Sequence, residues 1–307
     1  NFLIYLPWIL ILVFSFLYYR YTKSGFLSRD IDPKGKWFLV TGAASGIGKA
    51  TALNLLKLGA SVYATDINEK TLESIYKSYG KQVKFFKLDV TNRKEIESVV
   101  ENIKKLNTGL YGVVNSAGVA VPPGFKRVVA KGALELDIDT DVIPMYDINV
   151  FGTIRVNSAV FDLLWESKGV VANIASVAGR LAAPGMSTYA GTKHAIVGYS
   201  ASMRREMARY GMRVVCIEPG FTDTPLLDTS RTQQGADMTQ TRLTDLFATV
   251  GNQQALKDNI GPCQSADDVA DRITTALLCS SGVAPHLLID ANRFSVWVLL
   301  SILPHAW

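Results

Sequence analysis

Three side chains have the types and the spacing that acid–base chemistry on an oxygen atom requires. Ser176 closes an apolar run, and Tyr189 and Lys193 follow at positions i and i+4 of a helical pattern. On a helix those two side chains share one face. A tyrosine with an ordinary pKa of about 10 is a poor base at neutral pH, but a cation within about 4–6 Å favours the phenolate. The spacing therefore predicts that Tyr189 exchanges protons with help from Lys193, while Ser176 holds the reacting oxygen.

A glycine-rich turn nearer the amino terminus is suited to phosphate groups. Gly42, Gly46 and Gly48 lie between a short apolar strand, 37–41, and an amphipathic helix. Glycines at such a turn let the backbone approach a pyrophosphate, and the helix terminus offers unpaired N–H groups.

The next predicted strand ends at Asp66, where a dinucleotide-binding fold places an acid on the adenosine ribose. A carboxylate accepts hydrogen bonds from the 2′-hydroxyl and repels a 2′-phosphate. No basic residue lies in the glycine turn to attract that phosphate. The sequence therefore predicts NAD as the cofactor, with NADP less favoured.

The elements that must position these residues alternate between strands and helices. Further strands are expected at 61–66, 83–90, 110–118, 169–176, 213–220 and 285–290. Helices are expected at 68–80, 91–106, 145–167, 188–210 and 266–279. Thr91 is the expected N-cap of the second of these helices. The alternation predicts a single α/β domain of Rossmann type, a doubly wound parallel sheet with helices on both faces.

Residues 1–22 are expected to form an N-terminal transmembrane helix. Phe2 to Tyr19 carry no charge, and their number is close to the ~20 residues that span a bilayer. Aromatic residues lie toward both ends and basic residues follow from Arg20 onward, as at a membrane face. A cleaved signal peptide usually has a shorter apolar core behind a basic region, which this sequence does not show. By the positive-inside rule, the part after the anchor faces the cytosol.

The remaining chain divides into a linker, 23–35, a Rossmann-type domain, 36–290, and an apolar tail, 291–307. Within the domain, 221–265 is polar and too long for an ordinary connection, and such segments usually carry function. We expect it to form much of a substrate pocket. The tail is too short to span a bilayer and suits an interfacial helix or a dimer contact.

Composition excludes other classes of protein. The net charge of the 307 residues is +5 and the basic residues are scattered, which argues against nucleic acid as a partner. Cys216, Cys263 and Cys279 form no CxxC pair, and the three histidines are widely dispersed. The sequence therefore predicts neither a metal site nor a disulfide framework.

Four motifs, in the same order, resemble those of the short-chain dehydrogenase/reductase family. TGAASGIG at 41–48 resembles the family's TGxxxGxG, NSAG at 115–118 its NNAG, YAGTK at 189–193 its YxxxK, and PGFTDT at 219–224 its PGxxxT. Ser176 and Asn149 fall where that family keeps its catalytic serine and asparagine. The resemblance covers about residues 35–290.

The departures from these motifs are small. Ser116 replaces the second asparagine of NNAG, a position that the resemblance associates with sheet stabilisation rather than chemistry. Gly191 and Thr192 stand where alanine and serine are common in the YxxxK motif.

The resemblance implies a role for each motif. Tyr189 exchanges the proton, Lys193 lowers its pKa and binds the nicotinamide ribose, Ser176 orients the substrate oxygen, and Asn149 supports a water relay. The implied cofactor-binding residues are Gly42, Ser45, Gly46, Ile47, Gly48, Asp66, Asp89, Val90, Asn115, Ala117, Gly118, Tyr189, Lys193, Pro219, Gly220, Thr222 and Thr224. Among them, Asp89 and Val90 flank the adenine, and Asn115 and Thr224 help seat the ribose and nicotinamide.

The apolar ends and the RRE stretch at 204–206 resemble the membrane-bound branch, which includes retinol, 17β-hydroxysteroid and 3-hydroxybutyrate dehydrogenases. We expect a membrane-anchored oxidoreductase that transfers hydride between NAD and an alcohol or carbonyl group of a lipophilic substrate. The alternatives are an NADPH-dependent keto-lipid reductase and a non-catalytic nucleotide-binding membrane protein. The expected location is the endoplasmic reticulum or another intracellular membrane, with the catalytic domain in the cytosol. A homodimer is expected through the Tyr189 helix and the preceding long helix.

Overall fold

The computed structural model describes residues 29–121, 131–182, 184–226, 241–245, 263–280 and 286–289. The expected anchor, the apolar tail and most of 221–265 lie outside these residues. Within the described part of the chain, no helix is both long enough and apolar enough to cross a membrane.

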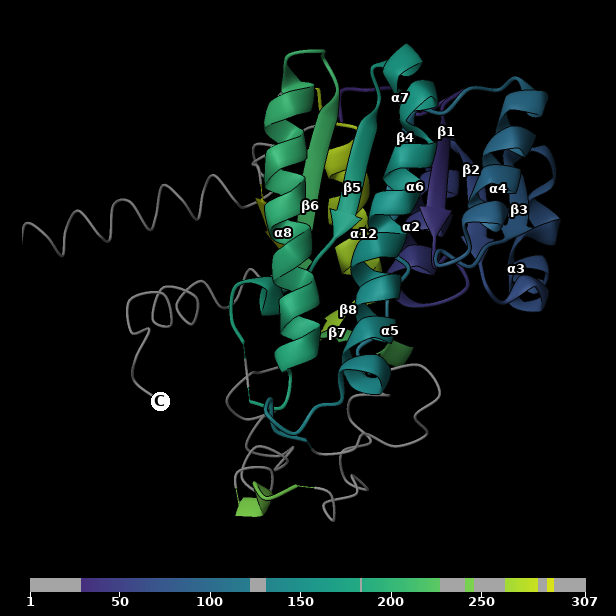
Figure 1. Cartoon of the computed structure of the whole chain (residues 1–307). Coiled ribbons are helices and arrows are strands. Elements are labelled where there is room, and N and C mark those ends of the chain that lie inside the picture. The colour runs from purple at the N-terminus through teal and green to yellow at the C-terminus, as the bar shows by residue number, and fades with distance from the viewer. Residues whose placement is uncertain are drawn as a thin grey trace, which may run out of the picture.

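A seven-stranded sheet, in the order β3-β2-β1-β4-β5-β6-β9, forms the centre of the molecule (Figure 1). The strands are β1 (Trp37–Thr41), β2 (Ser61–Asp66), β3 (Val83–Lys87), β4 (Gly112–Asn115), β5 (Val170–Ile174), β6 (Arg213–Pro219) and β9 (His286–Ile289). Every neighbouring pair is parallel. The order reverses between β1 and β4, so the prediction of a doubly wound, Rossmann-type parallel sheet is confirmed.

Helices cover both faces of this sheet (Figure 1). One layer holds α2 (Gly46–Lys57), α3 (Glu69–Tyr76) and α12 (Ala266–Leu277). The other holds α4 (Arg93–Leu106), α6 (Thr153–Ala159), α7 (Phe161–Ser167) and α8 (Ser187–Ala208). Shorter elements are η2 (Lys77–Gln82), η3 (Ile138–Val142), α5 (Ile143–Tyr146), η4 (Asp147–Gly152), η5 (Val177–Gly179), β7 (Thr222–Asp223) and β8 (Gln264–Ser265).

Alternate strand residues supply the two halves of the core. Phe38 and Val40 of β1 pack in the cluster shared with α2 and α12. Leu39, between them, packs with Val113 and Val171 in the cluster shared with α4 and α6. A parallel sheet covered on both faces needs apolar residues at consecutive positions, which explains the unbroken apolar runs in the sequence.

The helix expected over 145–167 is not one regular α-helix. Its first turns, η4, have π-helical hydrogen bonding, and the helix breaks at Val160, where φ is −93° and ψ is 2°. A π turn adds a single residue to a turn, which apolar periodicity does not resolve.

The N-cap of α4 is Asn92, and the prediction of Thr91 was wrong. The Asn92 side chain accepts hydrogen bonds from the N–H groups of Lys94 (3.1 Å) and Glu95 (3.4 Å). The Thr91 hydroxyl instead donates to Asp89 Oδ1 at 2.7 Å, so it is not available to the helix terminus.

The chain enters the domain at the amino ends of the strands. The Arg29 guanidinium forms an ion pair with Asp271 in the middle of α12, and the Asp30 carboxylate accepts hydrogen bonds from Ser280, three residues after that helix. The Ile31 N–H donates to the Leu278 carbonyl at 3.0 Å. These contacts fix residues 29–31 on the edge of the sheet opposite the carboxyl ends of the strands.

Candidate active site

The carboxyl ends of β1, β4, β5 and β6 meet at one edge of the sheet, and the predicted site residues lie in the loops and helices that follow them. In doubly wound sheets, ligands bind at this edge, at the point where the strand order reverses. Here that point lies between β1 and β4.

The glycine turn between β1 and α2 makes close backbone contacts that only glycine permits. Gly42 has a φ of +67°, and a Cβ there would lie 2.9 Å from the Ala117 nitrogen. A Cβ on Gly48 would lie 2.2 Å from the Gly42 carbonyl oxygen. Gly46, with a φ of +51°, faces the Thr224 side chain, to which a Cβ would come within 3.3 Å. The first, second and fourth predicted motifs therefore meet at this turn.

The amino terminus of α2 fits an anionic ligand. Its N-cap, Ser45, is extended and makes no capping hydrogen bond, and the first turn holds no acidic residue. By contrast α3, α4 and α12 each have a capping side chain and an acidic first turn. Together with the glycine cradle, the free N–H groups of α2 provide the site that a pyrophosphate requires. Ile47 in this turn packs partly against the core.

Asp66 lies beside the glycine turn, as predicted. Its Oδ2 accepts a hydrogen bond from the Ala44 N–H (3.1 Å), and its Oδ1 accepts one from the Asn68 N–H (3.0 Å). The buried Tyr76 of α3 donates its hydroxyl hydrogen to the Ala43 carbonyl at 2.8 Å. Burial raises the pKa of Tyr76, so this hydroxyl remains a donor at neutral pH. Tyr76 thereby connects the glycine turn to α3.

Asp89 and Val90 follow β3 on the same edge. Asp89 Oδ1 accepts hydrogen bonds from the Thr91 N–H (2.8 Å) and hydroxyl, which fixes the carboxylate. Val90 is buried against Gly152, where a Cβ would lie 2.6 Å from a Val90 methyl carbon.

The Asn115 side chain lies in the interior rather than at the cofactor cleft. Its Nδ2 donates to Asn157 Oδ1 (2.7 Å) and Asn173 Oδ1 (2.9 Å), and the residue is only 3% exposed. These amides join β4, α6 and β5. The sheet-stabilising role that we attributed to the position of Ser116 therefore belongs to Asn115, because the last residue of β4 directs its side chain into the core.

The loop after β4 connects the glycine turn to the catalytic helix. Ala117 lies against Gly42. A Cβ on Gly118 would lie 3.2 Å from Asn149 Oδ1 and 3.8 Å from Lys193 Nζ. A side chain at Gly118 would therefore crowd Asn149 and contact Lys193.

Asn149 holds this loop against α8. Its Oδ1 accepts the Val119 N–H at 2.8 Å, and its Nδ2 donates to the Val119 carbonyl (2.9 Å) and to the Thr192 hydroxyl (3.1 Å). The residue lies within the π-helical η4, a kind of irregularity that often occurs at functional sites. Asn149 thus connects Val119, which follows the NSAG motif, to Thr192 of the YAGTK motif.

Ser176, Tyr189 and Lys193 are brought together as the sequence predicts. Ser176 follows β5, and its hydroxyl accepts the Ala178 N–H at 3.1 Å. Ser176 lies close enough to Tyr189 to act on its pKa as a hydrogen-bond partner. The Lys193 ammonium lies 5.6 Å from the centre of the Tyr189 ring and donates to the Ile174 carbonyl at 3.0 Å.

The pKa of Tyr189 differs from the expectation. Burial of the ring raises it above its ordinary value, and the hydrogen bond from Ser176 opposes that rise. Lys193 itself is buried, and burial lowers its pKa from 10.5 to about 8. The lysine is still mainly cationic at neutral pH, and its ammonium donates to the Ile174 backbone carbonyl.

The turn after β6 also lies at the carboxyl edge of the sheet. The Thr222 hydroxyl donates to the Gly220 carbonyl at 3.1 Å, next to Pro219. The Thr224 hydroxyl donates to the Thr222 carbonyl at 3.3 Å, and its side chain lies against Gly46. Strand β7 pairs with β8, so the two ends of 221–265 lie side by side.

A family profile described as short chain dehydrogenase matches residues 36–235. The chain belongs to the short chain dehydrogenase family. Human retinol dehydrogenase 16 is 30% identical to it over 73% of this chain and 68% of the relative. A 3-oxoacyl-[acyl-carrier-protein] reductase of Thermotoga maritima is 33% identical over 64% of this chain and 77% of the relative. Estradiol 17-beta-dehydrogenase 2 of Rattus norvegicus is 32% identical over 69% of this chain, but the match spans only 54% of that relative.

Solved structures share the fold of this short chain dehydrogenase. A short chain dehydrogenase/reductase from Burkholderia phymatum in complex with NAD has a TM-score of 0.73 and 22% identity, covering 89% of this chain and 95% of the other. The 3-ketoacyl-(acyl-carrier-protein) reductase from Brucella melitensis complexed with NADH has a TM-score of 0.69. The family is one of oxidoreductases whose fold binds a nicotinamide cofactor, so the predicted family and cofactor class are confirmed.

In this short chain dehydrogenase, the glycine turn and the α2 terminus are the residues suited to the pyrophosphate, and Asp66 is placed for the adenosine ribose. When bound, a nicotinamide cofactor supplies or accepts hydride. Ser176 and Tyr189 lie together at the carboxyl edge of the sheet, beside the residues suited to the cofactor.

Two contacts in this site were not predicted from the sequence. One is the hydrogen bond from Tyr76 to the glycine turn, and the other is a bidentate ion pair between Arg180 and Glu218. Each joins residues more than 30 positions apart, for which periodicity gives no signal. The sequence signal was the charge of Glu218, which follows the apolar run from Val214 to Ile217.

Proposed function

We propose that this short chain dehydrogenase transfers hydride between NAD and an alcohol or carbonyl group of a lipophilic substrate, such as a retinoid or steroid. The observation that carries the proposal is the grouping of Ser176, Tyr189 and Lys193 at one site, with the Lys193 ammonium 5.6 Å from the centre of the tyrosine ring. A phenol next to a hydroxyl is suited to pass one proton to or from a substrate oxygen.

The roles of the side chains follow from their surroundings. Tyr189, with its raised pKa, is protonated in the apo protein and can donate to a carbonyl oxygen as reduction proceeds. In the direction of alcohol oxidation it must first lose that proton, and a cationic Lys193 stabilises the phenolate once its ammonium turns away from the Ile174 carbonyl. Asn149 keeps the Val119 backbone and Thr192 in place beside them.

The preference for NAD rests on Asp66. Its carboxylate faces the glycine turn through the Ala44 N–H, and the turn residues 43–45 are Ala-Ala-Ser, with no cation to attract a 2′-phosphate. A charge-assisted pair of hydrogen bonds to ribose contributes about 1.5–3 kcal/mol. We therefore expect kcat/KM with NAD to exceed that with NADP by more than about tenfold, or 1.4 kcal/mol.

The lipophilic substrate class is supported by the surface near the site and by the names of the relatives. Leu134, Ile138, Ile143 and Leu243 are exposed large apolar residues on segments that follow β4 and β6. Glu135 holds two of these segments together, since its carboxylate accepts hydrogen bonds from the Thr241 hydroxyl (2.7 Å) and the Arg242 N–H (2.8 Å). Two of the relatives are named for retinol and estradiol.

The deciding experiment is an activity screen of the purified membrane fraction with retinol, steroids, 3-hydroxybutyrate and keto-sphingoid bases, each with NAD(H) and NADP(H). Turnover of a retinoid or steroid with NAD at more than tenfold the kcat/KM of NADP supports the proposal. Preference for NADPH with a keto-lipid would replace it with a reductase function, which the similarity to the Thermotoga maritima reductase favours as second candidate. No turnover by a folded protein that binds NADH would leave a nucleotide-binding protein.

Membrane attachment, location and a homodimer are further parts of the proposal. Residues 1–22 would anchor the chain in an intracellular membrane such as the endoplasmic reticulum, with the domain in the cytosol. Proteolysis of intact microsomes should then remove the domain without detergent. Exposed Phe151, Phe161, Trp165 and Tyr210 lie on η4, α7 and next to α8, the elements expected to form the dimer. Light scattering of detergent-solubilised protein measures that state.

A further inference from the structure

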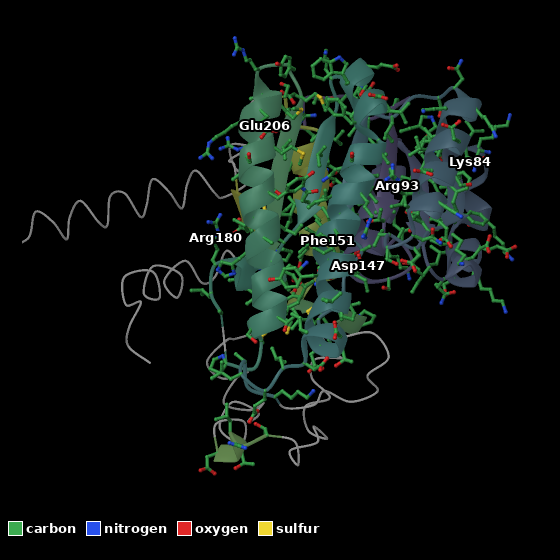
Figure 2. The ribbon with its side chains drawn as sticks, in the orientation of Figure 1. Lys84, Arg93, Asp147, Phe151, Arg180 and Glu206 are labelled. Carbon is green, nitrogen blue, oxygen red and sulfur yellow. The ribbon has the colours of Figure 1, made fainter. Side chains whose placement is uncertain are left out.

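An ion pair outside the four motifs connects residues 175–182, the serine loop, to the neighbouring strand, β6. Arg180 directly follows η5, and Figure 2 shows it beside α8. Its guanidinium donates from Nε to Glu218 Oε2 and from Nη2 to Glu218 Oε1, each at 2.9 Å. The Glu218 side chain is completely buried on β6, whereas the Arg180 side chain is 33% exposed.

The serine loop is positioned by its contacts with β6 and with α8. Ser176 follows the end of β5, and the only strand-like contact beyond β5 that the described residues show is the Ala175 N–H donating to the Ile217 carbonyl at 2.7 Å. The loop then passes through the short η5 turn to Arg180. The ion pair therefore holds the far end of the loop to the same strand, β6, that its near end contacts.

The loop also lies directly against the catalytic helix. A Cβ on Gly179 would lie 2.9 Å from the Lys193 carbonyl oxygen and 2.9 Å from a Val197 methyl carbon. A change in the position of η5 must therefore change the separation between the Ser176 loop and the part of α8 that carries Tyr189 and Lys193.

The chemistry of the pair suits orientation better than stability. Burying a carboxylate is costly, and the attraction of its partner often only offsets that cost. A two-point arginine–carboxylate contact, however, fixes both the distance and the angle between the two groups. Such a contact is expected where geometry matters more than free energy.

We infer that Arg180 and Glu218 are positioning residues, which set the Ser176 hydroxyl relative to Tyr189 by fixing the serine loop to β6. The inference rests on the proposed oxidoreductase function for its kinetic consequence, but the geometric part is measured without turnover.

The test compares Arg180→Lys, Arg180→Met and Glu218→Gln with a matched control, Arg213→Met. Arg213 lies at the other end of the same strand, where its guanidinium donates to the carbonyls of Leu277 (2.9 Å) and Cys279 (2.6 Å), far from the serine loop. Backbone hydrogen exchange of the full chain reports the loop, NADH titration reports the cofactor site, and steady-state kinetics with the substrate from the screen report chemistry.

In Arg180→Met we expect the amides of residues 175–182 to exchange at least about tenfold faster. We expect kcat to fall at least about tenfold and the Kd for NADH to change less than about threefold, because a misplaced catalytic group lowers the rate rather than the cofactor affinity. Arg180→Lys should restore part of kcat, since it keeps the charge and one contact. Arg213→Met should lower the melting temperature while leaving kcat of the folded protein unchanged.

Unchanged exchange over 175–182 in the folded Arg180→Lys and Glu218→Gln variants would overturn the inference. Equal losses of kcat in Arg180→Met and Arg213→Met would also overturn it, because the effect would then be general destabilisation. If the wild-type protein turns over none of the substrates, the proposed function fails, and hydrogen exchange alone decides the positioning role.

Discussion

Replacing Lys193 with methionine should make the protein more stable at neutral pH while removing its activity. The lysine is only 6% exposed, and burial lowers its pKa from 10.5 to about 8. Methionine keeps an unbranched chain in the same space and removes the charge. The expected gain arises because the native fold holds an ammonium group where a neutral side chain would cost less free energy.

The size and sign of the effect follow from proton linkage. Between pH 8 and 10.5 the unfolded chain binds a proton that the folded lysine has lost, so this residue's contribution to the free energy of unfolding rises with pH. Below about pH 8 the lysine is protonated in both the folded and the unfolded state, so the fold bears the full free-energy cost of the buried ammonium group. At about 1.4 kcal/mol per tenfold change in proton affinity, this cost is about 3 kcal/mol. Loss of the 3.0 Å hydrogen bond from Nζ to the Ile174 carbonyl offsets about 1 kcal/mol of the gain.

Lys193→Met should therefore be more stable than the wild type by about 2 kcal/mol at pH 7 and less stable by about 1 kcal/mol near pH 10.5. Urea unfolding of the cofactor-free proteins, followed by circular dichroism from pH 7 to 10.5, measures the difference in free energy of unfolding between the variant and the wild type. The titration of all other groups largely cancels in this difference. A difference that stays constant with pH, or one that grows in favour of the variant as pH rises, would refute the reasoning.

Three further predictions concern the site and the anchor. Tyr189→Phe should lower kcat by about 10²–10⁴-fold with NADH affinity retained, since only the hydroxyl is removed; more than about a tenth of wild-type kcat, with chemistry rate-limiting, would contradict the assignment. Gly48→Ala should weaken NADH binding at least about tenfold, because its Cβ would lie 2.2 Å from the Gly42 carbonyl oxygen. The control Gly198→Ala should not weaken binding, because a Cβ there meets open space. Equal Kd values for NADH in the two variants would exclude the tight turn as the cause. Deleting residues 1–22 should release at least part of the protein from membranes in a sedimentation assay, and full retention of the folded domain in the pellet would place the anchor in the tail or in 221–265.

Much of the fold could be predicted from the sequence because it depends on local signals. The apolar runs gave β1 and β2 with their observed bounds, and the other strands of the sheet within a few residues. The glycines at 42, 46 and 48 predicted a close turn because no other residue tolerates their contacts. Tyr189 and Lys193 could be paired from helical spacing alone.

The rest depends on contacts between distant residues. The Asn115 side chain could not be assigned to the interior, because that depends on Asn157 and Asn173 meeting it across two other elements. The direction of the Tyr189 pKa was predicted wrongly for a similar reason. Sequence spacing shows that a lysine is near, but only the structure shows that Tyr189 is partly buried and that the ammonium donates to the Ile174 carbonyl.

The docking of residues 29–31 on the end of α12 has a consequence for how a substrate dissolved in a bilayer would reach the site. The chain enters the domain at the amino edge of the sheet, and Ser176 and Tyr189 lie at the carboxyl edge. A strand of the length of β6, seven residues, spans roughly 23 Å at about 3.3 Å per residue. Suppose that residues 1–22 are the anchor that we propose and that the strands are perpendicular to the bilayer. Ser176 and Tyr189 would then lie at least the length of β6 above the lipid headgroups. Under that proposal, a lipophilic substrate would reach Tyr189 without crossing open water only if the strands lay roughly parallel to the membrane plane.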